Sequence, residues 1–320
     1  MKPIQNVLIV FPFDRAGRER LSKDYPALTF CFEEKPSREQ VQAADVIFGN
    51  PEVELLRGCD RLQWIQLSSA GADRYAEQGL LPEGALLTNA TGAYGLTISE
   101  HMMGMLLMLT KKLHLLRDHQ NQGEWRNAGP VKTLMGANVL VLGAGNIGTE
   151  FAKRVKAFGS YTVGVRRTPG EKPDCFDEMH LMGELDTLLP RADVVAMALP
   201  GTSETTHIID RKRLSEMKDG AVILNVGRGS AIETEALCDA LESGKLWGAG
   251  LDVTDPEPLR AGHRLWKYPN AVVTPHCAGG FGLSETKEYI AEIFRRNLEK
   301  LLNGEELENV VDPATGYRKR

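Results

Sequence analysis

Residues 139–148 read Val-Leu-Val-Leu-Gly-Ala-Gly-Asn-Ile-Gly and carry the strongest fold signal in the chain. Four apolar residues lead directly into a GxGxxG loop, and residues 149–158 after the loop have the pattern of a helix. A strand, a glycine loop and a helix in this order form the unit that binds the pyrophosphate of a dinucleotide. A purely structural glycine turn would contain the same glycines, but the flanking strand and helix favour the dinucleotide site.

Each glycine of this loop has its own expected role. Gly143 permits the tight turn, Gly145 lets the backbone approach a pyrophosphate, and Gly148 allows the helix to pack closely on the strand. The first N–H groups of the helix, which include those of Asn146 and Ile147, would face the phosphates. We therefore predict that these five residues bind a dinucleotide coenzyme.

Similar strands recur on both sides of the glycine loop. Apolar runs alternate with helix-like stretches and lie at residues 7–11, 46–49, 62–67, 139–142, 161–165, 194–199, 221–226, 248–251 and 271–274. Several runs consist of consecutive Val, Ile, Leu and Ala, a pattern typical of parallel strands covered on both faces. The predicted fold class is therefore α/β, with doubly wound parallel sheets.

Two long helices interrupt this alternation and suggest a division of the chain. The first is expected over 97–119, with a Met-rich apolar face that we interpret as core, and the second over 284–302. The chain has 320 residues, about twice the usual length of a domain. Two domains are therefore expected.

The composition excludes several classes of protein. Hydrophobic residues make up 42% and charged residues 25%, as in globular proteins with a buried core. A formal net charge of -5 argues against nucleic acid or a membrane as partner. The five cysteines, without a CxxC pair, argue against a disulfide framework or a metal site. No apolar run approaches the ~20 residues that span a bilayer, and no signal sequence is evident, so we expect a soluble cytoplasmic protein.

The strand after the glycine loop points to the choice of coenzyme. An NAD-binding protein usually ends this strand with an acidic residue that accepts hydrogen bonds from the adenosine ribose. Here the strand over 161–165 ends in Arg166, Arg167 and Thr168, and guanidinium groups match the geometry of a 2′-phosphate. We predict that NADP(H) is preferred and that NAD(H) is possible. The alternative is two solvated arginines at the end of a strand.

Three later strand ends carry the polar residues of a possible active site. They are the segments 225–229, 251–259 and 274–280, which supply Arg228, Glu257 and His276. In open α/β sheets, ligands bind at the carboxyl ends of the strands. Reduction of a 2-oxo acid needs a cation for the carboxylate, an acid for the carbonyl oxygen, and a carboxylate that tunes this acid.

With these motifs in order, the sequence resembles the D-isomer-specific 2-hydroxyacid dehydrogenases over almost its whole length. The shared motifs begin at Leu62-Gln63-Trp64-Ile65-Gln66 and Ser69-Ala70-Gly71-Ala72-Asp73 and continue through Ser99-Glu100-His101, the glycine loop, Leu199-Pro200, Glu204-Thr205 and the three strand ends. The segment 307–313 matches the end of the family's chains.

The resemblance assigns the catalytic roles. Arg228 would pair with the carboxylate and the 2-oxo oxygen of the substrate, and His276 would be the general acid–base that protonates this oxygen. Glu257 would hydrogen-bond the histidine and favour its charged form. Ala70 and Gly71 would hold the substrate carboxylate through backbone N–H groups.

The resemblance also adds residues to the predicted coenzyme site, and one position departs from the family's pattern. It places coenzyme contacts, beside the glycine loop, at Leu199, Pro200, Thr205, Val226, Gly227, Asp252 and His276, with Asp252 at the nicotinamide carboxamide. Asp255 is taken as a loop residue and His101 as a packed helix residue. Cys277 stands where an aliphatic residue is common, and we interpret it as a small buried filler.

The family's architecture implies two doubly wound domains. Residues 1–98 and 285–320 would form a flavodoxin-like substrate domain, and residues 99–284 a Rossmann coenzyme domain. The resemblance also implies a homodimer built through the coenzyme domains. The function expected is NADPH-preferring reduction of small 2-oxo acids, such as glyoxylate or hydroxypyruvate, to D-2-hydroxy acids. Two alternatives stay open: a dinucleotide-sensing binding protein of the same fold, and an NAD-dependent phosphoglycerate dehydrogenase.

Overall fold

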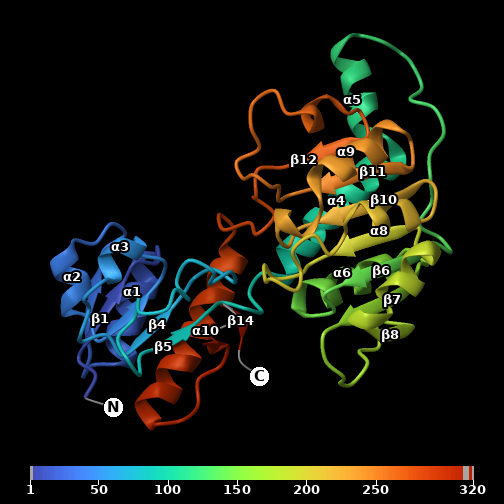
Figure 1. The fold of residues 1–320 in the computed structure, drawn as a ribbon. Coiled ribbons are helices and arrows are strands. Elements are labelled where there is room, and N and C mark those ends of the chain that lie inside the picture. Colours follow the sequence, from blue (N-terminus) through green and yellow to red (C-terminus); the bar gives the residue numbers. More distant parts are fainter. Residues whose placement is uncertain (1–2, 313–316, 319–320) are drawn as a thin grey trace. The chain divides into compact units, whose positions relative to one another are not determined.

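The computed structural model describes residues 3–312 and 317–318, which fall into two compact units (Figure 1). Unit 1 comprises Met1–Ala93 with Gly282–Arg320, and unit 2 comprises Tyr94–Phe281. The sequence places the division at 98/99 and 284/285, whereas the units divide just before each long helix begins. A helix packs as one piece, so each long helix lies wholly within one unit. Pro313, at the end of the C-terminal motif, lies outside the described residues.

Unit 1 is built on a five-stranded parallel sheet. The strand order is β2-β1-β3-β4-β5. The strands are β1 (Asn6–Ile9), β2 (Thr29–Phe32), β3 (Val46–Phe48), β4 (Trp64–Gln66) and β5 (Leu86–Thr88), and the helices are α1 (Arg15–Asp24), α2 (Arg38–Ala43), α3 (Val53–Leu56) and α10 (Ser284–Asn303). A short antiparallel pair, β13 (Val311–Asp312) and β14 (Tyr317–Arg318), follows α10.

The second long helix, α10, is fixed to the sheet of unit 1 by aromatic stacking and a buried amide. The Phe294 ring lies 4.2 Å from the Phe48 ring with an angle of 1° between the planes. Asn297 donates a buried hydrogen bond of 2.9 Å to Gln66. These contacts explain why the C-terminal segment of the chain returns to the N-terminal unit.

Unit 2 contains a seven-stranded parallel sheet of order β12-β11-β10-β9-β6-β7-β8. Its strands are β6 (Asn138–Leu142), β7 (Tyr161–Arg166), β8 (Glu178–Leu181), β9 (Val194–Met197), β10 (Ala221–Asn225), β11 (Leu246–Leu251) and β12 (Ala271–Val273). Its helices are α4 (Gly95–Lys111), α5 (Leu113–Asn121), α6 (Asn146–Ala157), α7 (Leu185–Leu188), α8 (Arg211–Glu216) and α9 (Thr234–Glu242).

The strand that leads into the glycine loop, β6, faces a separate core on each side. Val139 and Val141 belong to a cluster with α4 and α6, whereas Leu140 and Leu142 belong to a cluster with α8 and α9. Helices therefore cover both faces of this sheet, as consecutive apolar residues in a strand require. The predicted class, two parallel-sheet α/β domains, is confirmed, and the strand order in unit 2 is that of a Rossmann fold.

One predicted helix is wrong in its continuity. The expected helix over 97–119 is broken at Lys112, which has a left-handed backbone with φ 57°, and it forms α4 and α5 instead. Tertiary contacts hold the break: the Lys112 ammonium donates to the Ala128 carbonyl at 3.0 Å and lies 4.9 Å from the Trp247 ring. The Met-rich face of α4 is buried as expected, but Leu113 on α5 is about half exposed.

Two further expectations concern cysteines and membranes. All five cysteines are free thiols. Within the described residues, no helix combines the length and the apolar character needed to span a bilayer.

Candidate active site

The three predicted catalytic residues follow neighbouring strands of unit 2. Arg228 comes after β10, Glu257 after β11 and His276 after β12, and these strands are adjacent and parallel. Their carboxyl ends therefore lie at one edge of the sheet. The loops after β10 and β11 touch, because a Cβ atom at Gly229 would lie 2.0 Å from the carbonyl of Thr254. The fold thus gathers the three segments at one place.

His276 and Glu257 form a direct pair. The Nδ1 atom of His276 lies 2.6 Å from Oε1 of Glu257, and both side chains are about half exposed. An ionised carboxylate only accepts hydrogen bonds, so Nδ1 carries a proton and donates a hydrogen bond to Glu257. The second ring nitrogen, Nε2, remains for a substrate. This orientation is the one that a general acid–base needs.

The backbone of His276 is held in an uncommon conformation. Its φ is 51°, in the left-handed region that non-glycine residues rarely adopt. The N–H group of His276 donates to the carbonyls of Asp252 at 2.8 Å and Thr274 at 3.0 Å. Such a conformation persists where surrounding bonds over-determine it.

Arg228 is supported from the end of β10. Asn225 donates from its side-chain amide to the Arg228 carbonyl at 2.8 Å and accepts from the N–H of Gly227 at 3.0 Å. One guanidinium nitrogen of Arg228 donates to the Gly227 carbonyl at 2.8 Å. A Cβ at Gly227 would lie 2.3 Å from the carbonyl oxygen of Leu199, so this turn is pressed against the end of β9. These contacts therefore hold the segment that carries Arg228 in place.

Asp252 is a buried anchor. Its side chain is only 2% exposed, and its carboxylate accepts the N–H of Cys277 at 2.9 Å, the N–H of Ala278 at 3.0 Å and the hydroxyl of Thr274 at 2.6 Å. The resemblance assigns this aspartate to the nicotinamide carboxamide. In this chain the carboxylate holds the loop that follows His276.

The glycine loop fits a dinucleotide pyrophosphate. Gly143 has φ 97°, and a Cβ there would lie 2.6 Å from the carbonyl oxygen of Ala198. A Cβ at Gly148 would lie 2.2 Å from the Gly143 carbonyl oxygen, so α6 packs tightly against the turn. At Gly145 a Cβ would meet nothing within 4 Å, and this residue provides no side chain to cap α6. The first N–H groups of α6, from Asn146 and Ile147 onward, face this open space.

The two arginines after β7 differ in their surroundings. The guanidinium of Arg166 donates to the carbonyls of Gly170 and Glu171, the latter at 2.9 Å, so it braces its own loop. Arg167 is exposed and Thr168 is partly buried. Of the two predicted readers of a 2′-phosphate, Arg167 is exposed, whereas Arg166 is partly buried and bonded to its own loop.

The predicted adenosine side is a self-supporting loop. The hydroxyl of Thr205 donates to the Pro200 carbonyl at 2.7 Å and accepts the N–H of Thr202 at 2.9 Å. Leu199 and Val226 are buried at the ends of β9 and β10. Thr205 therefore shapes this loop, whose backbone would meet the coenzyme.

Ala70 and Gly71 lie in unit 1, in the loop after β4. The Ala70 carbonyl accepts the side-chain amide of Asn89 at 2.7 Å, and the Gly71 carbonyl accepts the Ser69 hydroxyl at 2.7 Å. Within the described residues, the N–H groups of Ala70 and Gly71 donate no hydrogen bond. A loop with its carbonyls satisfied and its N–H groups open suits a carboxylate ligand.

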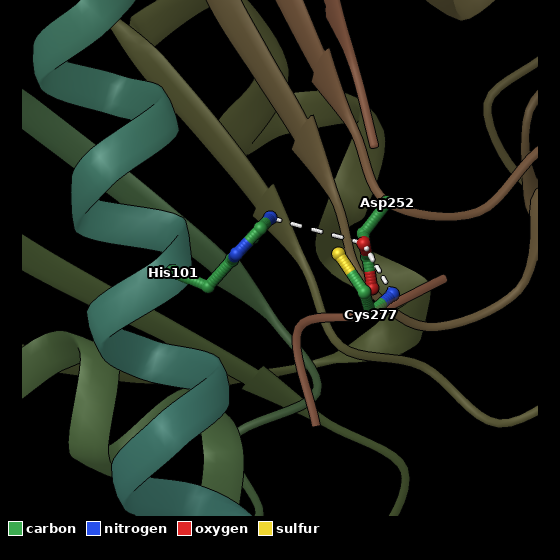
Figure 2. A group of neighbouring side chains, drawn as sticks. All are labelled: His101, Asp252 and Cys277. Atoms are coloured by element: carbon green, nitrogen blue, oxygen red, sulfur yellow. Dashed lines mark hydrogen bonds and ion pairs between the residues drawn. The ribbon is translucent and has the colours of Figure 1, made fainter. Parts of the chain in front are cut away.

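Sequence reasoning missed one group beside His276. Figure 2 shows His101, Asp252 and Cys277 converging, with ligand-type atoms all within 4.8 Å of one another. Nε2 of His101 lies 3.0 Å from the Thr274 hydroxyl, so His101 is not merely a packed helix residue. The Thr-Pro-His order after β12 was the available signal, because it places a hydroxyl two residues before His276.

Comparison with known proteins identifies a family that matches more than half of the chain. Residues 103–278 match the family model "D-isomer specific 2-hydroxyacid dehydrogenase, NAD binding domain". The chain is 32% identical over 272 residues to glyoxylate/hydroxypyruvate reductase B of Pectobacterium carotovorum subsp. carotovorum (strain PC1), with 83% of each chain covered.

Solved structures agree over nearly the whole chain. A D-isomer specific 2-hydroxyacid dehydrogenase family protein from Aeromonas salmonicida subsp. salmonicida A449 has a TM-score of 0.85 and 34% identity, covering 97% of this chain and 100% of that one. A D-isomer specific 2-hydroxyacid dehydrogenase from Xanthobacter autotrophicus Py2, in complex with NADPH and MES, has a TM-score of 0.82 and 25% identity, covering 98% and 100%.

Proposed function

This chain belongs to the D-isomer specific 2-hydroxyacid dehydrogenases, NAD(P)-dependent oxidoreductases of small 2-oxo and 2-hydroxy acids, and we propose that it reduces glyoxylate, hydroxypyruvate or a similar 2-oxo acid with NADPH. The observation that carries the proposal is the 2.6 Å hydrogen bond between His276 and Glu257 at the sheet edge that also bears Arg228. A proton donor and a carboxylate-binding cation are what this reduction requires.

The proposed mechanism assigns one task to each side chain. Arg228 binds the substrate carboxylate and polarises the 2-oxo group, and Ala70 and Gly71 stay the predicted N–H donors to that carboxylate. The glycine loop and the N-terminus of α6 would hold the coenzyme, which would supply a hydride for C2 of the substrate. As the C=O π bond breaks, the imidazolium of His276 gives its Nε2 proton to the carbonyl oxygen. Glu257 fixes the ring by accepting from Nδ1 and stabilises the imidazolium before the transfer.

The test of the proposal is turnover followed by coenzyme absorbance. We expect oxidation of NADPH with glyoxylate or hydroxypyruvate, and slower reaction with pyruvate and phenylpyruvate. NAD⁺ reduction with 3-phosphoglycerate, together with inactivity on the panel, would instead support the phosphoglycerate dehydrogenase alternative. Tight coenzyme binding without turnover on any of these substrates would support a dinucleotide-sensing protein.

The proposed preference for NADPH rests on Arg167. This guanidinium is exposed after β7, where an acidic ribose reader would stand in an NAD-specific protein, and the bound NADPH of the Xanthobacter relative accords with it.

We expect Arg167→Gln to weaken NADPH binding about 10- to 100-fold and NADH binding less than about twofold, because only NADPH offers a 2′-phosphate. Coenzyme fluorescence titration measures both dissociation constants. Arg166→Gln is the matched comparison: it removes the brace on Gly170 and Glu171, so we expect losses of similar size for both coenzymes. Equal losses for the two coenzymes in Arg167→Gln would refute the preference.

We also propose that unit 2 mediates a homodimer through the segment after the break at Lys112. Exposed apolar side chains gather in this segment at Leu113, Leu116, Trp125, Val131 and Met135. The segment is tied down, because Lys111 donates to the Lys132 carbonyl at 2.6 Å and Lys112 to the Ala128 carbonyl. Exposed apolar side chains on a segment held in place favour a protein interface, and the occupant proposed is a second copy of the chain.

Trp125→Glu is expected to convert the dimer to a monomer in sedimentation velocity, since a fully exposed indole would be replaced by a charge inside the interface. Trp266→Glu is the control: this tryptophan is also exposed but lies outside the segment, so the dimer should persist. A wild-type protein that sediments as a monomer would refute the proposed dimer.

A further inference from the structure

A chain of hydrogen bonds connects α4 to the loop that bears His276. Nε2 of His101 lies 3.0 Å from Oγ1 of Thr274, and this hydroxyl donates to Oδ1 of Asp252 at 2.6 Å. Asp252 in turn accepts the N–H groups of Cys277 and Ala278, directly after His276. The three linked side chains come from positions far apart in the sequence, on α4, after β11 and after β12.

We propose that His101 is a positioning residue for the reaction: through Thr274 and Asp252 it fixes the strained backbone on which His276 stands. The inference rests on the proposed function, since His276 is the general acid–base there. His101 itself touches no reacting atom in this scheme.

The direction of each bond follows from counting protons. Both oxygens of Asp252 accept backbone N–H groups, as an ionised carboxylate does. The Thr274 hydroxyl has a single proton, which it uses to donate a hydrogen bond to this carboxylate. The threonine oxygen therefore has only lone pairs left for His101. His101 must therefore donate, and its Nε2 carries a proton. Each member of the chain orients the next.

The loop after β12 depends on this chain because its own backbone is unfavourable. His276 has φ 51°, and its N–H is held by the carbonyls of Asp252 and Thr274. The same two residues thus bond His276 through their backbones and each other through their side chains. A rotation of the Asp252 carboxylate would release two N–H groups of the loop and shift the imidazole relative to Glu257.

Helix α4 is a rigid support for His101. The side chains next to it, Met102 and Met105, are fully or almost fully buried against the sheet. Six residues earlier, Gly95 packs against the side chain of Asn146 in the glycine loop, where a Cβ would lie 2.3 Å from Oδ1. One helix therefore contacts both the coenzyme-binding loop and the group that holds His276.

A metal site is the competing interpretation of the cluster in Figure 2. His, Asp and Cys are all zinc ligands. However, Oδ1 of Asp252 already accepts two hydrogen bonds, from Thr274 and from the N–H of Cys277, and Oδ2 accepts a third. A metal ion would have to displace the bonds that shape the loop, so the hydrogen-bonded arrangement is the better account.

Two pairs of variants test the proposal by steady-state kinetics. His101→Leu and Thr274→Val each break the chain, and we expect each to lower kcat about tenfold, the size of one lost hydrogen bond of about 1.4 kcal/mol. His101→Gln retains an N–H donor at the reach of Nε2, and Thr274→Ser retains the hydroxyl, so both should recover most of the rate. The Kd for NADPH should stay within about twofold throughout.

The double variant separates positioning from general destabilisation. If both residues act in the same chain of hydrogen bonds, the kcat of the double variant His101→Leu with Thr274→Val should be no lower than that of the slower single variant. The first substitution already breaks the chain, so the second causes no further loss. The proposal would be overturned if the double variant lost rate by the product of the two single losses. It would also be overturned if His101→Leu kept the wild-type rate, or if His101→Gln were as slow as His101→Leu. A loss of the same size in Cys277→Ser would overturn it in favour of the metal site.

A readout without turnover keeps this test independent of the proposed reaction. Long-range ¹H–¹⁵N correlation of histidine-labelled protein distinguishes the ring tautomers, and the His101 signal is identified by its absence in His101→Gln. We expect a proton on Nε2 of His101, and loss of this preference in Thr274→Val. A neutral ring with its proton on Nδ1 would overturn the inference, whereas an inactive protein with the expected tautomer would overturn only the proposed function.

Discussion

We expect His276→Ala to lower kcat by about 10²- to 10⁴-fold, the range contributed by a positioned general acid–base. The hydrogen bond of 2.6 Å to Glu257 occupies Nδ1 and leaves Nε2 as the proton donor. Alanine offers no proton to the oxygen that develops charge as the hydride arrives. The Kd for coenzyme should change less than about threefold, because the glycine loop and α6 are untouched. Stopped-flow reduction and fluorescence titration measure the two quantities.

His207→Ala is the matched control for this variant. His207 also has a left-handed backbone, with φ 50°, but it is exposed and has no role in the proposed mechanism. Both substitutions alter a strained position, whereas only the one at His276 removes the acid. A kcat that falls equally in both variants would mean that backbone strain, and not proton transfer, explains the loss.

The second large effect is expected at Arg228. Arg228→Gln should lower kcat/KM about 10³-fold, because two charge-assisted hydrogen bonds to the substrate are lost, each of about 1.5–3 kcal/mol. Arg228→Lys should recover only part of this, since an ammonium supplies the charge but not the planar fork. Steady-state kinetics with the best 2-oxo acid of the panel checks both values.

A neutral substrate makes the Arg228 test specific. The wild-type protein should strongly prefer a 2-oxo acid over its methyl ester, and Arg228→Gln should lose most of this preference, because the ester lacks the charge that the guanidinium binds. Arg213→Gln serves as the control, since Arg213 pairs with Asp186 at 2.6 Å in a surface ion pair. If Arg228→Gln kept the full preference for the acid, another group would be the carboxylate binder.

The fold could be predicted because its signals are local. Val139 to Leu142 are apolar on both sides of the strand, and the turn at Gly143 and the contact at Gly148 admit no side chain. Such patterns act within a few residues and need no knowledge of the rest of the chain. Edge strands such as β2 were missed, because their side chains alternate between partly buried and exposed and lack the continuous apolar run.

Some features of the site could be foreseen and others could not. The pairing of Glu257 with His276 follows from the family resemblance and is present as a short hydrogen bond. The different surroundings of Arg166 and Arg167 could not be predicted from the sequence. The fold of the loop at Gly170 and Glu171 determines that the Arg166 guanidinium bonds to the carbonyls of that loop.

The α/β class, the glycine loop and the strand ends that bear the polar residues follow from local residue patterns. The break of the long helix at Lys112 and the bond between His101 and Thr274 depend on contacts between distant segments. Distance along the chain explains this difference. Periodicity and turn chemistry act between near neighbours, whereas the bond between His101 and Thr274 joins residues 173 positions apart and exists only after α4 has packed on the sheet.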